Sequence, residues 1–254
     1  MLTFGLILGF CLFTSMPVVQ QETAPTVDEI LDRMKAHDEW QRLYLIEYQA
    51  QRRFSATNLK FKEDAMLEVR TTFRRPDTLE SQVLRAEGSR FIRERVFDKI
   101  LEAEIEAQST HTKQQIDIVP ANYSFTYFGR EECADRQCYR LRIVPKRKDK
   151  YLIDGQIWID TGDWGTVRIQ GSPAKRPSFW TRQTQIDRRY KRINGMWLTD
   201  RLESISDVLI AGRSSLTIQY SYESIQTDGL YGLPANSASV LTARSPRFPR
   251  PRAQ

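Results

Sequence analysis

Histidine is nearly absent from this chain, which carries only His37 and His111 among its 254 residues. The two lie far apart in sequence and away from any cysteine, so a metal site of His and Cys ligands is not expected. Ser172 and Ser178 have no histidine within reach by sequence, and the aspartates of residues 154–163 fall near turns, where Asp is common for backbone reasons. We therefore predict that the protein is not an enzyme, and that it carries no metal and no other cofactor.

Long apolar runs are also lacking. The longest lies within residues 1–15 and covers about ten residues, whereas a membrane-spanning helix needs about 20. Its length fits the core of a signal peptide, although no Lys or Arg precedes it, which leaves an N-terminal anchor or a misassigned start as alternatives. Phe10 is too large to precede a lipidated Cys11. We predict a signal peptide and linker over residues 1–24, and hence an exported protein.

Excess basic charge is scarce outside the last residues. The net charge is +6, but residues 230–254 contain four arginines and no acid, and without them the chain has 34 basic and 32 acidic residues. A nucleic-acid-binding face would place Lys and Arg along a folded surface beside stacking aromatics. We predict no nucleic-acid partner, and a disordered basic tail rich in Pro and Arg over residues 230–254.

What the chain does have is alternation of apolar and polar residues with period two, which is typical of half-buried strands. In residues 138–170 this pattern recurs three times, separated by turns such as Asp154-Gly155. Asn194-Gly195 is the strongest hairpin signal. Further extended segments are 43–55, 60–74, 78–86, 123–128, 181–193, 196–209 and 216–222, with a short one at 90–92. The total is about ten antiparallel strands.

Two segments favour helices. Thr26 and Glu29 form a capping box before apolar residues at helical spacing, which predicts a helix over 26–41. Residues 94–108 predict a second helix, with Phe97, Ile100 and Leu101 facing inward. Residues 109–122 are expected to be irregular.

The fold class that follows is mainly β with helices (α+β). We predict a strongly curved antiparallel sheet that forms an open half barrel, with helices covering its concave face. A closed barrel is the alternative. The domain is expected to span residues 25–229 and to be a monomer.

Cys133 and Cys138 flank a predicted hairpin turn. Opposed cysteines at the neck of a hairpin can meet the geometry of a disulfide, and an oxidising compartment favours pairing. We expect a disulfide, with two free thiols as the alternative.

Three consecutive motifs resemble a bacterial branch of the LolA-like, outer-membrane lipoprotein-sorting superfamily. They are Ile143-Val-Pro-Lys146, Asp154-Gly-Gln-Ile-Trp-Ile-Asp160 and Val167-Arg-Ile-Gln-Gly-Ser-Pro-Ala-Lys175, and the resemblance covers about residues 129–225. It implies an unclosed barrel whose interior holds acyl chains beneath helices. It also implies a periplasmic carrier of lipids or lipoproteins that docks on a membrane acceptor.

The resemblance leaves an alternative function, because relatives in the superfamily sense lipoproteins and act on a membrane-protein regulator. The carriers use an arginine inside the cavity that ties the lid helices shut. Arg52, Arg53 and Arg70 are candidates for that role, and no motif selects one of them.

Wide apolar side chains would suit the wall of an acyl-chain cavity, although a plain packed core needs the same residues. The predicted lipid-binding residues are Trp158, Phe179, Trp180, Trp197, Phe97, Ile100 and Leu101.

A basic run near residue 148 would suit anionic headgroups at a membrane surface, with a solvated hairpin end as the alternative. Its predicted members are Lys146, Arg147, Lys148 and Lys150.

Overall fold

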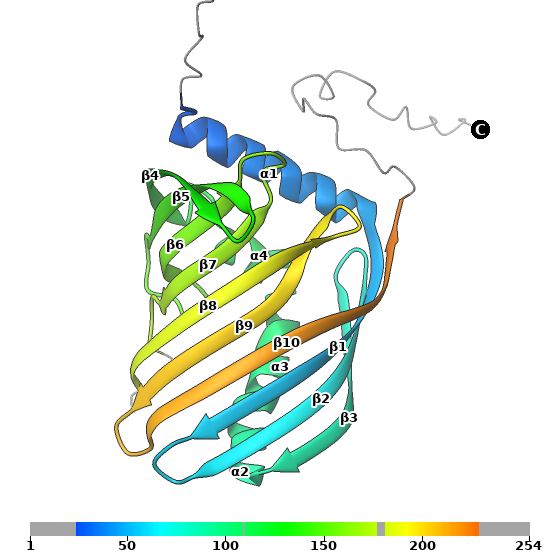
Figure 1. Cartoon of the computed structure of the whole chain (residues 1–254), viewed down its shortest axis with the longest axis vertical. Helices are drawn as coiled ribbons and strands as arrows, with labels where there is room; N and C mark the ends of the chain where they lie inside the picture. The colour runs from blue at the N-terminus through cyan, green and yellow to red at the C-terminus, as the bar shows by residue number, and fades with distance from the viewer. Residues whose placement is uncertain (1–23, 109, 177–180, 229–254) are drawn as a thin grey trace, which may run out of the picture.

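A single antiparallel sheet of ten strands makes up most of the protein, in the order β3-β2-β1-β10-β9-β8-β7-β6-β5-β4 (Figure 1). The computed structural model describes residues 24–108, 110–176 and 181–228. The strands are β1 (Leu45–Asn58), β2 (Glu63–Arg74), β3 (Thr78–Gly88), β4 (Tyr123–Cys133), β5 (Arg136–Pro145), β6 (Ile153–Asp160), β7 (Thr166–Pro173), β8 (Thr181–Ile193), β9 (Met196–Val208) and β10 (Gly212–Thr227). The sheet is curved and does not close, so the open half barrel is confirmed and the closed barrel is wrong.

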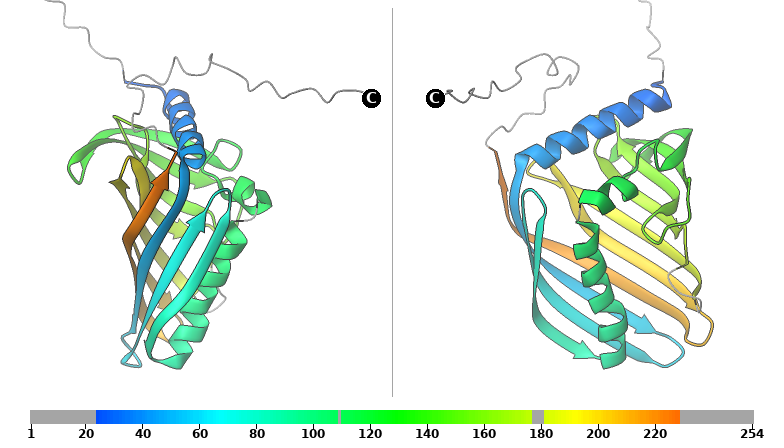
Figure 2. Two further views of the ribbon diagram at one scale, coloured as in Figure 1. Left: turned by 90° about the vertical axis from the view of Figure 1, so that its right-hand side faces the viewer. Right: turned by 180° about the vertical axis from the view of Figure 1, so that it is seen from behind.

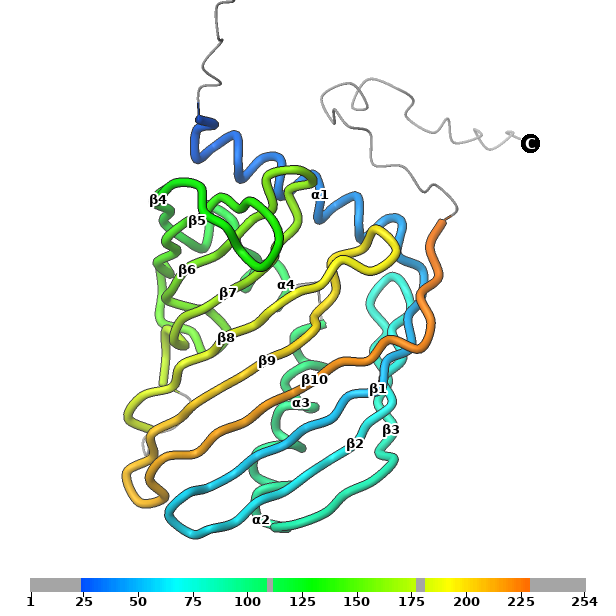
Figure 3. Tube along the Cα trace, viewed as in Figure 1, coloured from blue at the N-terminus to red at the C-terminus, as the bar shows by residue number. Residues whose placement is uncertain are grey.

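The first and last strands pair with each other inside the sheet, as the third and fourth strands from the β3 edge (Figure 3). As a result β3 and β4, which are consecutive in sequence, form the two opposite edges. The connection between them, residues 89–122, has to cross the whole width of the sheet. This topology explains why the helices that it contains lie across one face.

The alternation of buried and more exposed side chains that the sequence predicted is present in the strands. In β5, Tyr139, Leu141 and Ile143 are buried, whereas the arginines between them are not. The predicted hairpin at Asn194-Gly195 joins β8 to β9, and both residues have positive φ, 49° and 82°, as a type I′ turn requires.

The glycines of two sequence motifs face each other across β6 and β7. Gly155 and Gly171 are register partners, and a Cβ on Gly155 would come within 2.0 Å of the Gln170 carbonyl oxygen. Only glycine lets the two backbones approach this closely.

Helix α1 (Val27–Tyr44) begins as predicted and extends beyond the expected end at residue 41. The Thr26 side chain accepts from the Glu29 backbone N–H at 3.2 Å, and the Glu29 carboxylate accepts from the Thr26 backbone N–H at 2.8 Å, completing the capping box. Ile30, Leu31 and Met34 pack on buried residues of β4–β6.

The crossing connection is more helical than the sequence indicated. The strand predicted at 90–92 is wrong: α2 (Arg90–Ile92) continues through a π-helical turn (Arg93–Phe97) into α3 (Asp98–Ala107). A run of three residues holds too little periodicity to separate strand from helix. Helix α4 (Thr110–Ile116) replaces the irregular segment, and its polar sequence gives no apolar stripe to detect.

Helix α1 lies at one end of the sheet, and α3 runs along a face of it (Figure 2). None of the described helices is long and apolar enough to cross a membrane. The predicted signal segment and tail lie outside the described residues, apart from residue 24.

Candidate functional site

A buried ion pair joins the sheet to α3. Arg52 of β1 has a side chain only 3% exposed, and its Nη1 atom donates to both carboxylate oxygens of Glu104 of α3, at 2.9 and 2.7 Å. Its Nη2 atom donates to the Ser81 hydroxyl on β3 at 3.3 Å. An arginine this deeply buried requires a counter-ion, because an unpaired charge in a low-dielectric interior is strongly unfavourable.

Aromatic rings complete the surroundings of Arg52. Its guanidinium carbon lies 5.1 Å from the ring centre of Phe54 and 5.6 Å from that of Tyr220. Burial disfavours the cation, but Glu104 and Tyr220 outweigh it, so the pKa of Arg52 lies above its ordinary value. Burial also raises the pKa of nearby Tyr48, to about 12. The site therefore combines fixed positive charge with neutral hydroxyl groups.

Of the three arginines that the sequence offered for the interior, only Arg52 has a buried side chain. Arg53 pairs with Glu68 and is 60% exposed, and Arg70 pairs with Glu223 and is 45% exposed. Only Arg52 faces α3. The sequence contains one sign of this burial. Side chains in a strand alternate between two faces, and Arg52 falls on the same face as the buried Ala50, Phe54 and Ala56. A charged residue in the apolar phase of a strand has to find a buried partner.

Helix α3 is held to the sheet by few apolar contacts. No residue of α3 is fully buried, and Ile105 is 59% exposed. Ile100 and Leu101 are partly buried against the sheet, and the π-helical turn before α3 contributes the fully buried Phe97. The structure thus brings Phe97, Ile100 and Leu101 together, over an apolar floor made by Phe54, Ala56, Ala65, Leu67, Val69 and Ile218.

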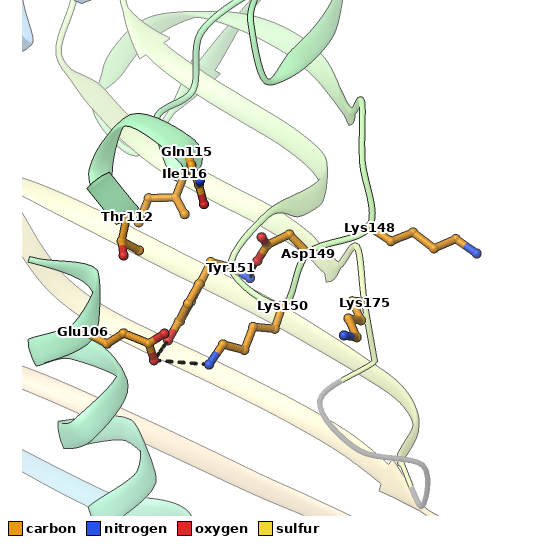
Figure 4. Close-up of a pocket in the computed structure, with 9 residues that line it drawn as sticks. All are labelled: Glu106, Thr112, Gln115, Ile116, Lys148, Asp149, Lys150, Tyr151 and Lys175. Carbon is orange, nitrogen blue, oxygen red and sulfur yellow. Dashed lines mark hydrogen bonds and ion pairs between the residues drawn. The ribbon is translucent and has the colours of Figure 1, made fainter. Parts of the chain in front are cut away.

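A second polar contact holds the last turn of α3. The Glu106 carboxylate accepts from Lys150 Nζ at 3.2 Å and from the Tyr151 hydroxyl, both in the β5–β6 connection (Figure 4). These residues line a polar pocket of about 240 Å³. Its wall also includes Thr112 and Gln115 of α4, together with Lys175. The C-terminal half of α3 is therefore held by two ion pairs, one made by Glu104 and one made by Glu106.

Most of the predicted headgroup-facing run contacts the protein itself. Lys146 Nζ donates to the Pro120 carbonyl at 2.6 Å, and Arg147 donates to Asn122 Oδ1 at 2.7 Å and to the Gln115 carbonyl. Lys150 pairs with Glu106. Lys146 and Arg147 anchor the segment around α4, and Lys150 anchors the end of α3. Lys148 is exposed, and its side chain extends away from the pocket (Figure 4).

The structure separates the two described tryptophans of the predicted cavity wall from α3. Trp158 and Trp197 pack with Cys138 and Val167 in a cluster of their own. Trp158 alternates with Ile157 and Ile159, which pack under α1, so it points to the opposite face of β6. The sequence predicts that a tryptophan is buried, but not on which face. Phe179 and Trp180 lie outside the described residues.

Trp197 belongs to a polar network beneath α1. Its indole N–H donates to Asp163 Oδ1 at 2.9 Å, and Arg192 Nε lies 2.9 Å from Asp163 Oδ2. His37 of α1 is buried nearby, and neither ring nitrogen has a hydrogen-bond partner. Burial lowers the pKa of His37, which Asp163 opposes and Arg192 reinforces. Burial therefore favours the neutral form of the imidazole.

The predicted disulfide is confirmed, since Cys133 and Cys138 are bonded across the β4–β5 hairpin. In the described part of the chain, no group of three or more His, Cys, Asp or Glu side chains could hold a metal ion.

No family model and no curated protein matches the sequence. Several solved structures do match the chain. A DUF1329 family protein from Desulfovibrio piger is 14% identical, with a TM-score of 0.41, over 82% of this chain and 95% of the other. An outer membrane lipoprotein-sorting protein domain from Vibrio parahaemolyticus is 13% identical, with a TM-score of 0.40, over 80% and 92%. A LolA superfamily protein from Nitrosomonas europaea is 9% identical, with a TM-score of 0.33, over 82% and 96%.

Two of these three structures carry lipoprotein-sorting or LolA names, the superfamily that the sequence motifs resemble. Similarity at this level carries no conclusion about ligand or partner.

Proposed function

We propose that the protein is a periplasmic binding and transfer protein that buries the acyl chains of lipids or lipoproteins between the sheet and α3. The observation that carries this proposal is the ion pair between Arg52 and Glu104, which ties a helix without a fully buried residue onto an apolar floor. Such a helix is suited to act as a lid. In this proposal the face beneath α3 is the concave one, which is supported by the bend of the β1–β3 end of the sheet toward α3 (Figure 2).

The energies set a minimum for the ligand. Breaking a buried ion pair costs about 3–5 kcal/mol, and burying one methylene contributes about 0.8 kcal/mol. A chain of roughly four to six methylenes therefore offsets the loss of the pair. Short acids should leave the lid closed, whereas the acyl chains of membrane lipids exceed this length.

The first test is extraction of lipid from protein purified from the periplasm, followed by mass spectrometry. We expect co-purifying acyl species. A clean extract, together with no uptake of an acyl-linked dye, would remove the proposal.

The second test uses variants of α3. Glu104→Ala should speed uptake of the acyl-linked dye, because it releases the lid. Glu102→Ala serves as the matched control, since Glu102 pairs only with exposed Lys99 on the same helix. Equal rates in the two variants would mean that the Arg52 pair does not close the site.

The sensor function remains the second candidate, and one observation favours a protein partner. Strand β3 is a free edge of the sheet, and ten of its eleven residues are exposed. A free edge can accept an extended segment as an additional strand. Capture of a membrane protein by the intact chain, lost when Val83 is replaced by Pro, would favour this function over transfer.

A further inference from the structure

We propose that the ligand carries an anionic head, a carboxylate, which Arg188 receives and which takes the place of Glu104 beside Arg52. This inference rests on the proposed function and specifies the class of ligand: a single acyl chain that ends in a free acid.

A row of register partners crosses eight strands on one face of the sheet. In spatial order the row is Leu141, Ile157, Ile169, Arg188, Leu202, Ile218, Phe54 and Leu67. Residues directly opposite each other in a ladder share a face. Seven members are apolar, and five of these are buried. Arg188 is the one charged residue, at the point where the row passes from the α1 cluster to the α3 cluster.

Arg188 differs from the arginines beside it. Arg189 and Arg168 both pair with Asp187, at 3.0 and 2.7 Å. Arg188 is exposed and belongs to none of the ion pairs found among the described residues, and its side chain hydrogen-bonds to Tyr190. Tyr190 raises its pKa against the effect of desolvation, with help from Tyr220 and Glu104. Solvent reaches the Arg188 side chain, as expected of a group inside an open concavity.

Charge on this face is unbalanced. Arg52 and Arg188 are both cations, and Glu104 is the carboxylate that acts on both of them. The pair of Arg52 and Glu104 is neutral, so Arg188 is left with one positive charge in an apolar surface. A carboxylate is the natural partner, because guanidinium binds it with two parallel hydrogen bonds.

The same imbalance suggests how the lid opens. If Glu104 simply left with α3, Arg52 would remain as a buried, unpaired charge. Strands β8 and β1 are three places apart in the sheet, or about 14 Å at the usual strand spacing, and Glu104 acts on arginines from both. A ligand carboxylate that binds Arg188 and also reaches Arg52 can replace Glu104 as the counter-ion shared by both arginines. The acyl chain then occupies the apolar floor that α3 vacates.

The experiment compares two chain-matched probes, dodecanoate and dodecanol, below their aggregation limits at pH 8. We expect the wild-type protein to bind dodecanoate at least tenfold more tightly. Arg188→Gln should reduce this preference to less than threefold without changing the affinity for dodecanol. Arg189→Gln is the matched control, because Arg189 is the next residue and already has a partner, and it should keep the preference. Glu104→Gln should increase the affinity for dodecanoate more than that for dodecanol.

Each other outcome has a meaning. Equal affinity for the two probes would overturn the anionic head and leave the proposed function standing. Equal loss in Arg188→Gln and Arg189→Gln would overturn the role of Arg188. Tighter binding of dodecyl phosphate than of dodecanoate would replace the carboxylate by a phosphate. Binding of none of the probes would overturn both this inference and the proposed function. Melting temperatures equal to that of the wild type establish that the Arg188 and Arg189 variants are folded.

Discussion

Arg52 and Glu104 place opposite charges where the sheet face is otherwise apolar. Replacing Glu104 by Ala should lower the free energy of unfolding by about 3 kcal/mol, the lower end of the range for a broken buried pair, because the Glu104 side chain is 27% exposed. Urea denaturation measures this change. The control, Glu102→Ala, breaks an exposed pair and should cost less than about 0.5 kcal/mol. Similar losses in the two variants would contradict a special role for Glu104.

His37 should make stability depend on pH. Burial lowers its pKa below the ordinary value, which is about 6.5. Above that pH neither state binds the proton. Below it, the unfolded chain binds a proton that the folded protein does not bind. The free energy of unfolding therefore falls as pH falls, by at most about 1.4 kcal/mol per pH unit.

The test compares the wild type with His37→Phe, which keeps an aromatic ring beside Trp40. The stability of the variant relative to the wild type should rise between pH 7 and pH 5. Asp38, the exposed next residue of α1, is present in both proteins, so its own titration cancels in the difference. A constant difference across this range would mean that His37 is protonated in the folded state.

At the scale of elements, α1 depends on its first turn. Thr26→Ala removes the side chain that accepts from the Glu29 backbone N–H, and loss of such a cap costs about 1 kcal/mol. Thermal denaturation reports it. Lys35→Ala on the same helix removes only an exposed pair with Glu39, and should cost less than about 0.5 kcal/mol. If Lys35→Ala costs as much, the capping box is not what stabilises the start of α1.

Elements with strong local signals were predictable. The capping box marks the start of α1, and Asn-Gly marks the turn between β8 and β9. The segment from residue 89 to residue 122 was predicted less well. Its short helices carry weak periodicity, and they are stabilised by contacts made as the chain crosses from one sheet edge to the other.

At the scale of the whole molecule, we expect α3 to unfold locally before the sheet unfolds. Because no residue of α3 is fully buried, the amides of residues 98–107 should exchange with solvent well before those of β1 and β10, which are paired on both sides within the sheet. Hydrogen–deuterium exchange followed by mass spectrometry measures both segments in one experiment. Exchange of α3 only at the rate of global unfolding would show that it is not a separate lid.

By itself, the sequence determined the local structure: period-two alternation makes the strands, and the capping box starts α1. It left Arg52, Arg53 and Arg70 open as the interior arginine, although Arg52 does alternate in step with apolar neighbours. Only the tertiary structure decided that Arg52 meets Glu104, 52 residues away, and that Trp158 packs on the opposite face from α3. Local repeats fix which residues share a side, but the pairing of distant strands and the path of the crossing connection decide what each side touches.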